Sequence, residues 1–260
     1  MPTVTLLLKI YQDYQLKIVN EFLKSTFKDL KVKAKICGCT SLGWIQTSIS
    51  GEDESIAVNY LAKEIGFCPT SLDHVEKFST IKGYLAAVKK SREEIYIDVG
   101  VFSPNVTHAS IPLNYLQAQL VDGRKVAFKK IAELFGFCEN LPLTIKVLNV
   151  DKEKNSIKAT LSEKQLNQYR DWQKSLLDRL IILGSSAHEI QLVLKNTGLN
   201  RDVIDVEPLG MFEHALACKL GTDAVGLISK IGKVLRNAAF TVFNPKELQK
   251  FLEFSTALIF

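Results

Sequence analysis

The chain reads TIKGYLAAVKKSREEIYIDVG over residues 80–100. Apolar and polar side chains alternate on both sides of the turn-forming KKSREE, which is the period-two pattern of paired β-strands. Gly83 lies near one end of the segment and Gly100 closes the other. A glycine within a strand permits the bends by which a small barrel closes. The segment therefore predicts a long, curved hairpin.

A second hairpin follows further along the chain. Residues 143–162 read LTIKVLNVDKEKNSIKATLS and turn at the polar DKEKN. Between the two hairpins lie a loop that contains Pro104, the segment ASIPLNYL (109–116) and a helix expected at about 125–136. Together these elements are compatible with a small β-barrel over residues 78–163.

These segments resemble the RNA-binding repeat of the largest bacterial small-subunit ribosomal protein. That repeat is a five-stranded OB barrel that also occurs in exoribonucleases, exosome subunits and initiation factors. The matching residues are Gly83, the YIDVG of residues 96–100, Ile111 with Pro112, Val147, Asp151, Lys158, Leu161 and Ser162. The resemblance implies that the barrel binds RNA. One departure is Glu93, which stands near the position of the family's second stacking aromatic, because a carboxylate there repels phosphate.

The barrel is flanked by two stretches of mixed helix and strand. The first 70 residues read strand, helix, strand, strand, helix, which is most of a ferredoxin-like βαββαβ module. Residues 178–244 show the same order with all six elements. We therefore predict an α+β protein in which two ferredoxin-like modules flank a central OB-type barrel. The predicted domains are 1–77, 78–163 and 164–260, and the last begins with a linking helix.

The three-part order also resembles an uncharacterised archaeal protein family. The resemblance lies chiefly in RDVIDVEPLG (201–210) and CKLGTDAVGLISKIG (218–232). It implies a role in archaeal information processing and no specific activity.

Composition sets broad limits on partners and compartment. The formal charge is +5 and the pI is about 8.8, a mild basic excess that permits a polyanionic partner. We find neither a leader segment nor an uncharged apolar run long enough to span a bilayer, so we expect a cytoplasmic protein with no membrane partner. Cys37 and Cys39 are the closest cysteine pair, and no second pair completes four ligands, so we expect neither metal nor cofactor.

Candidate RNA-binding residues fall in and around the barrel. Tyr96 is a base-stacking candidate, Phe102 and His108 are expected in the following loop, and Lys158 lies in the last strand. Basic contacts to phosphate are expected from Lys89, Lys90, Arg92, Arg124 and Lys125. Each has an ordinary structural alternative: Tyr96 inside the barrel, and the basic residues as the solvated side of a turn or helix.

Lys31, Lys33 and Lys35 alternate along one predicted strand and so share a face. Within an open sheet they would form a basic stripe for RNA. On an edge strand they would instead discourage aggregation, which is the reading we favour.

The function predicted from the sequence is that of a non-enzymatic RNA-binding adaptor. It would act with a large RNA-containing machine such as the ribosome, the exosome or RNA polymerase. One alternative is a protein–protein interaction module that uses the barrel face. Another is a metal-dependent RNA-processing enzyme that uses Asp202, Asp205 or Asp223. We find no catalytic constellation in the sequence, since Ser185, Ser186 and His188 lack a serine elbow and an orienting acid.

Overall fold

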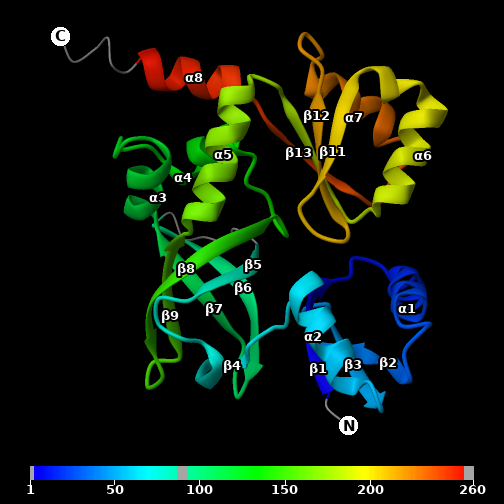
Figure 1. Cartoon of the computed structure of the whole chain (residues 1–260). Coiled ribbons are helices and arrows are strands. Elements are labelled where there is room, and N and C mark those ends of the chain that lie inside the picture. The colour runs from blue at the N-terminus through cyan, green and yellow to red at the C-terminus, as the bar shows by residue number, and fades with distance from the viewer. Residues whose placement is uncertain (1–2, 87–92, 255–260) are drawn as a thin grey trace. The chain divides into compact units, whose positions relative to one another are not determined.

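The computed structural model describes residues 3–86 and 93–254, and the chain divides into two units (Figure 1). The first unit contains the residues up to Val75 together with Val99–Thr107. The second contains Glu76–Asp98 and the residues from His108 onward. Strand β6 contributes residues to both units.

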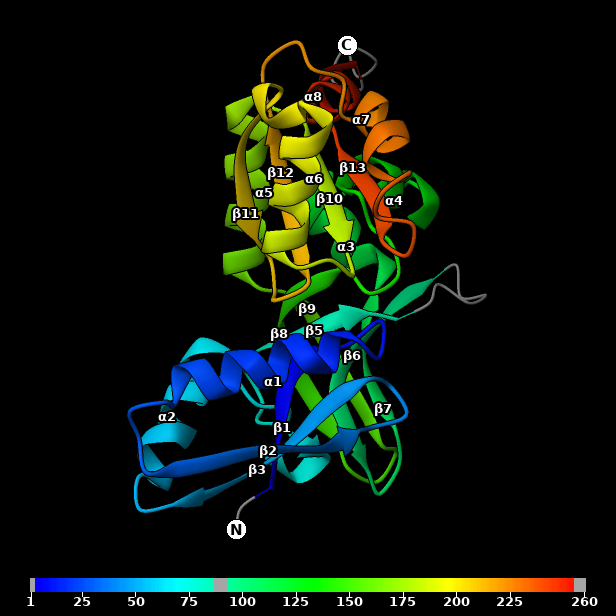
Figure 2. The same ribbon diagram turned by 90° about the vertical axis from the view of Figure 1, so that its right-hand side faces the viewer.

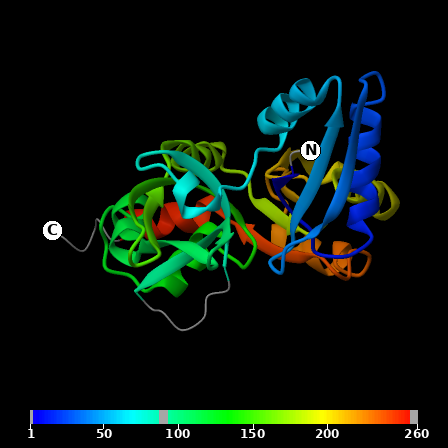
Figure 3. The same ribbon diagram turned by 90° about the horizontal axis from the view of Figure 1, so that it is seen from below.

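The first unit is built on a three-stranded antiparallel sheet in the order β1-β3-β2. Its elements are β1 (Thr3–Lys9), α1 (Gln15–Thr26), β2 (Val32–Cys39), β3 (Trp44–Gly51) and α2 (Glu54–Glu64). Helix α1 lies along the sheet and buries Val19 and Leu23 (Figures 2 and 3). Phe67 forms an isolated bridge with Leu6, and β4 (Thr70–Ser71) pairs with β6. A complete βαββαβ module would end in a strand paired with the first sheet. Here the Leu6–Phe67 bridge takes the place of that strand.

The position of β2 in its sheet distinguishes between the two readings of Lys31, Lys33 and Lys35. Lys33 and Lys35 are exposed on this strand, which is an edge of the three-stranded sheet, and Lys31 just before it donates to Glu52 at 2.8 Å. The arrangement matches the protective reading, in which charged side chains block pairing with another chain.

The central strands close into a five-stranded barrel, as predicted. They are β5 (Thr80–Leu85), β6 (Glu94–Ser103), β7 (Thr107–Pro112), β8 (Pro142–Asp151) and β9 (Ser156–Leu161). Their order is β6-β5-β8-β9-β7, and a β6–β7 pairing closes the ring; β7 and β9 run parallel. The short 3-10 helix η1 (Leu72–His74) precedes the barrel, and α3 (Leu113–Leu120) and α4 (Phe128–Phe135) connect β7 to β8.

The C-terminal part of the second unit has one four-stranded antiparallel sheet in the order β11-β12-β10-β13. Its elements are α5 (Glu163–Ser175), β10 (Arg179–Leu183), α6 (Ala187–Thr197), η2 (Leu199–Arg201), β11 (Val203–Pro208), β12 (Glu213–Cys218), α7 (Ala224–Ile231), β13 (Ala239–Phe243) and α8 (Pro245–Phe254). The element order from β10 to β13 is the predicted β-α-β-β-α-β.

Two helix caps in this part follow directly from local sequence. Ser186 caps α6 in a reciprocal capping box with Glu189, and Gly198 ends the helix in the left-handed conformation. Asp223 caps α7 by accepting from the backbone of Val225 and Gly226. Helix α7 ends at Ile231.

Both faces of the four-stranded sheet are covered. Helices α6 and α7 pack on one face around Leu180, Ile182 and Leu216. An aromatic cluster from α4, α5 and β13 lies against the other, and it consists of Phe135, Phe137, Tyr169, Trp172 and Phe243. Strands β10 and β12 are therefore buried on both faces, whereas the edge strand β11 is largely exposed. Leu176 lies beyond the end of α5 with φ 55° and is exposed.

A buried histidine in this sheet leads to a prediction about pH. His214 on β12 is 3% exposed, and burial lowers its pKa from 6.5 although the backbone of Ser185 partly opposes the shift. Below about pH 6.5 the unfolded chain therefore binds a proton that the folded chain still excludes, and stability falls until the lowered folded pKa is reached. One such group contributes at most about 1.4 kcal/mol per pH unit.

We expect His214→Gln to flatten the fall in unfolding free energy between about pH 6.5 and about pH 5, measured by urea denaturation. The exposed His188 provides the control, and His188→Gln should leave the slope unchanged. Equal slopes for wild type and His214→Gln would show that His214 is protonated equally in both states.

Candidate nucleic-acid interface

Tyr96 lies on the outside of the barrel. Its neighbours in β6, Ile95 and Ile97, are 3% and 0% exposed, whereas Tyr96 is 36% exposed. Because side chains alternate along a strand, Ile95 and Ile97 fill the interior and the Tyr96 ring faces outward. The alternative in which Tyr96 fills the barrel does not hold.

Strand register places Tyr96 in a row with Lys158. Leu113 donates to the carbonyl of Glu93, and His108 Nδ1 lies 4.0 Å from Asp98 Oδ1; both contacts belong to one antiparallel register of β6 and β7. In that register Tyr96 lies opposite Ser110. Ser110 in turn pairs with Lys158 across the parallel β7–β9 ladder. With strands about 4.8 Å apart, the Tyr96 and Lys158 backbones are about 10 Å apart.

The row continues onto β8. Lys158 pairs with Asn149, and Lys146 pairs with Thr160. Lys146 and Lys158 are exposed, while their sequence neighbours Ile145, Val147 and Ile157 are buried and point into the barrel. We call Tyr96, Ser110, Lys146 and Lys158 the outer barrel face. Lys146 is not among the predicted RNA-binding residues, although the alternation in LTIKV already places it outside.

His108 flanks this surface on β7. Its side chain is 30% exposed, and the Asp98 carboxylate beside it is 2% exposed. Phe102 and His108 were both expected in a loop, and this is wrong: β6 extends to Ser103 and β7 begins at Thr107, so both residues lie in strands. Phe102 is half-buried.

Acidic groups lie beside the Tyr96 ring. The Tyr96 hydroxyl donates to Glu94 Oε1, and this hydrogen bond, with burial and the Glu94 charge, raises the pKa of Tyr96. Glu93 is exposed one residue earlier. The carboxylates reduce the attraction of this end of the face for phosphate, and the aromatic ring itself remains accessible.

The remaining predicted residues separate into three groups. Lys89, Lys90 and Arg92 lie outside the described residues. Lys125 is exposed in the connection between α3 and α4. Arg124 donates through Nη1 and Nη2 to the carbonyls of Phe251 and Leu252, at 2.8 and 2.6 Å, and lies over the Phe251 ring. Its guanidinium thus holds helix α8, a role for which the local sequence has no signal.

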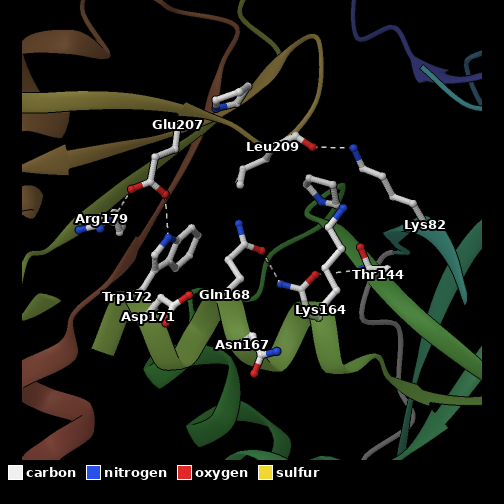
Figure 4. A pocket seen from close by; sticks show the side chains of 13 residues that line it. Lys82, Thr144, Lys164, Asn167, Gln168, Asp171, Trp172, Arg179, Glu207 and Leu209 are labelled. Atoms are coloured by element: carbon white, nitrogen blue, oxygen red, sulfur yellow. Dashed lines mark hydrogen bonds and ion pairs between the residues drawn. The ribbon is translucent and has the colours of Figure 1, made fainter. Parts of the chain in front are cut away.

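A second polar surface is an open cleft of about 840 Å³ within the second unit (Figure 4). Strands β5 and β8, helix α5 and the segment that follows β11 form its walls. Its lining residues are Lys82, Pro142, Thr144, Lys164, Gln165, Asn167, Gln168, Asp171, Trp172, Arg179, Glu207, Pro208 and Leu209.

One end of this cleft is neutralised by its own contacts. Arg179 Nε donates to Glu207 Oε1 at 3.0 Å, and Trp172 Nε1 donates to Glu207 Oε2 at 2.7 Å. The other end holds two lysines. Lys82 Nζ donates to the Leu209 carbonyl at 2.5 Å. Burial lowers the pKa of Lys82, the Glu213 charge opposes the shift, and the Lys164 charge adds to it.

Neither lysine of the cleft was predicted as a site residue. Lys82 and Lys164 are far apart in sequence and come together only because α5 packs beside β5 and β8. No local pattern could have indicated the meeting.

The residues named for the metal-binding and catalytic alternatives have the following contacts. Among residues 3–86 and 93–254, no three or more His, Cys, Asp or Glu side chains group closely enough to hold a metal ion. Asp223 serves as a helix cap, and Asp205 accepts from the backbone of Val206. Cys37 and Cys39 are reduced and exposed. In the described part of the chain no helix is long and apolar enough to cross a membrane.

Three family models match the chain in succession. They are the DUF2110 N-terminal domain at residues 3–71, the DUF2110 central domain at 75–173 and the DUF2110 C-terminal domain at 177–243. No curated protein matches the chain.

Several solved structures show distant likeness. An uncharacterised protein from Methanocaldococcus jannaschii is 11% identical, with 34% of this chain and 95% of that chain covered and a TM-score of 0.23. A chain in a complex of a/eIF2alpha, aDim2p and rRNA from Pyrococcus horikoshii is 12% identical, with 48% of this chain and 64% of that chain covered and a TM-score of 0.26. The intact alpha subunit of aIF2 from Pyrococcus abyssi is 9% identical, with 65% of this chain and 96% of that chain covered and a TM-score of 0.26. Likeness at this level identifies neither a ligand nor an activity.

Proposed function

The chain belongs to the DUF2110 family, whose models match it in three successive domains, and we propose that it is an RNA-binding protein. It acts as a non-enzymatic adaptor that contacts single-stranded or irregular RNA through the outer barrel face. It works with a large RNA-containing machine such as the ribosome, the exosome or RNA polymerase.

The observation that carries this proposal is the row formed by Tyr96, Ser110 and Lys158 across three neighbouring strands. An exposed aromatic ring accepts a stacked base, and such a contact contributes about 1 to 3 kcal/mol. A lysine about 10 Å away suits the adjoining phosphate backbone. Stacking and phosphate contacts tolerate many sequences, which fits an adaptor better than a sequence-specific reader.

Topology supports the choice of face. The ring order β5-β6-β7-β9-β8 with a parallel β7–β9 pair supports an OB-type assignment for the barrel. OB folds bind oligonucleotides over their second and third strands, which correspond to β6 and β7. The antiparallel sheet and element order of β10 to β13 support a ferredoxin-like assignment for the C-terminal module.

The proposal predicts salt-dependent binding of single-stranded RNA, measured by fluorescence anisotropy between about 50 and about 300 mM salt. Tyr96→Ala should weaken binding by about 5- to 150-fold, the equivalent of one stacked base. Lys158→Ala should reduce the slope of log affinity against log salt by about 1. Lys174→Ala alters an exposed residue at the C-terminal end of α5 and should leave both binding and the salt slope unchanged.

Absent or salt-independent binding would overturn the RNA assignment. Because the adaptor is proposed to be non-catalytic, labelled RNA should also remain intact when the protein is incubated with magnesium or manganese. Metal-dependent cleavage by the purified protein would favour the processing-enzyme alternative.

The contact between Tyr96 and Glu94 favours a second candidate, a protein-binding role for the same face. A tyrosine beside two carboxylates suits a basic protein surface as well as a base. If Tyr96→Ala removes a nuclease-resistant protein partner and leaves RNA anisotropy unchanged, the protein-binding role replaces the RNA role.

A further inference from the structure

We propose that the cleft beside helix α5 binds a nucleotide, with the phosphate held by Lys82 and Lys164 and the nucleoside lying along α5. The site is separate from the Tyr96–Lys158 row and does not depend on it. The phosphate comes either from a free nucleotide or from the phosphorylated end of an RNA.

The two lysines bring positive charge to one end of the cleft. Within residues 3–86 and 93–254, Lys164 has no hydrogen-bond or ion-pair partner, and Lys82 donates to a neutral carbonyl. Their ammonium groups point toward the same end of the cleft (Figure 4). Burial lowers the pKa of Lys82, the Glu213 charge opposes the shift, and the Lys164 charge adds to it, so an anion between the two lysines reduces their mutual repulsion. A phosphate dianion neutralises both charges, whereas a carboxylate neutralises one.

Helix α5 orders the polar groups along the cleft. Lys164, Gln168 and Asp171 are spaced at i, i+4 and i+7, so they share the face that lines the cleft. Lys164 also lies in the first turn of α5, where the helix dipole adds to the attraction for an anion. At about 1.5 Å per residue, Asp171 lies about 10 Å farther along the helix. The cleft is therefore positive at one end and acidic at the other.

This polarity matches the chemistry of a nucleotide. The phosphate is anionic, and the sugar hydroxyls and base amino groups at the opposite end donate hydrogen bonds to groups such as the Asp171 carboxylate. The side-chain oxygens of Gln168 and Asn167 already accept from Gln165 and Arg170, which orients their amide N–H groups for acceptors on a base. Pro208 and Leu209 supply an apolar surface opposite α5.

The size of the cleft suits a ligand larger than a bare phosphate ion. Pockets for organic ligands span about 300 to 1,000 Å³, and 840 Å³ falls in this range. The combination of a cationic end, amide groups along one wall and an acidic far end suits a phosphorylated polar ligand.

The test is isothermal titration calorimetry of the full chain with the four nucleoside 5′-monophosphates, the matching nucleosides and inorganic phosphate. We expect at least one nucleotide to bind more tightly than its nucleoside and than phosphate. Lys164→Ala should weaken that binding about tenfold or more, the equivalent of one charge-assisted hydrogen bond, and Lys164→Glu should abolish it. Lys164→Arg should retain most of it. Lys174→Ala, at the other end of α5, should have no effect.

The two sources of phosphate are separated by competition. A 5′-phosphorylated RNA that displaces the nucleotide when its 5′-hydroxyl counterpart does not would identify an RNA end as the ligand. Displacement by neither RNA would identify the free nucleotide. Lack of nucleotide binding, or binding that survives Lys164→Glu, would overturn the site.

This outcome is distinguishable from failure of the RNA-binding proposal. Tyr96→Ala should leave nucleotide binding intact, since Tyr96 does not line the cleft. Loss of RNA binding in Tyr96→Ala without any nucleotide binding would support the barrel face and contradict the cleft.

Discussion

Tyr169→Ala is expected to lower the unfolding free energy of the second unit by about 3 to 5 kcal/mol, the range for removing a large buried aromatic side chain. Tyr169 is 4% exposed and touches four other rings. Its centroid lies 5.2 Å from Phe135, 5.7 Å from Trp172, 5.8 Å from Phe243 and 6.2 Å from Phe137. Edge-to-face pairs such as those with Phe135 and Trp172 add to the burial energy.

The measurement is urea denaturation followed by tryptophan fluorescence. The chain has two tryptophans, of which Trp172 belongs to the aromatic cluster and Trp44 to the first unit. A Trp44→Phe background therefore reports on the second unit alone. Tyr115→Ala removes an exposed tyrosine from α3 and should change stability by less than about 0.5 kcal/mol. A Tyr169→Ala cost below about 1 kcal/mol would show that the cluster does not stabilise this unit.

Glu207→Leu should cost about 3 kcal/mol, because it removes one partner from a largely buried ion pair. The Arg179 side chain is 6% exposed and that of Glu207 is 29% exposed. Without the carboxylate, the Arg179 charge loses its anion, and Trp172 Nε1 loses its hydrogen-bond acceptor. The same urea experiment measures the loss.

The double variant Arg179→Met/Glu207→Leu separates charge from packing. Since it leaves no buried charge uncompensated, we expect it to be more stable than Glu207→Leu alone. The exposed pair of Arg170 and Glu163 is the control, and Arg170→Ala should cost at most about 1 kcal/mol. Additive losses in the double variant would show that the two side chains act independently.

The barrel illustrates how far local pattern reaches. The alternation around Ile95, Tyr96 and Ile97 was enough to predict a strand with one face buried, and the turn residues before it marked its start. Helix boundaries followed in the same way from Ser186 and Gly198, since a cap acts within one helical turn. The sequence left open whether Tyr96 points into the barrel or to its outside, because alternation alone does not show which face of a strand lines the interior.

Other predictions missed because long-range contacts overrode the local pattern. Phe102 and His108 were expected in a loop, but pairing with neighbouring strands extended β6 and began β7 earlier. Arg124 was expected to contact phosphate, but its guanidinium donates hydrogen bonds to two carbonyls of helix α8. Phe67 forms a single bridge with the first sheet, and strand β4, which follows Phe67, pairs with β6 instead.

Strands, helices and caps were therefore readable from this chain without its coordinates, because period-two and period-3.6 patterns and capping residues act over a few neighbours, and the barrel followed from the resemblance to the OB repeat. The aromatic cluster around Tyr169, the pairing of Arg179 with Glu207 and the cleft between Lys82 and Lys164 were not. Each joins side chains from elements distant in sequence, and which of these meet is set by how whole elements pack, a property that no short window of residues encodes.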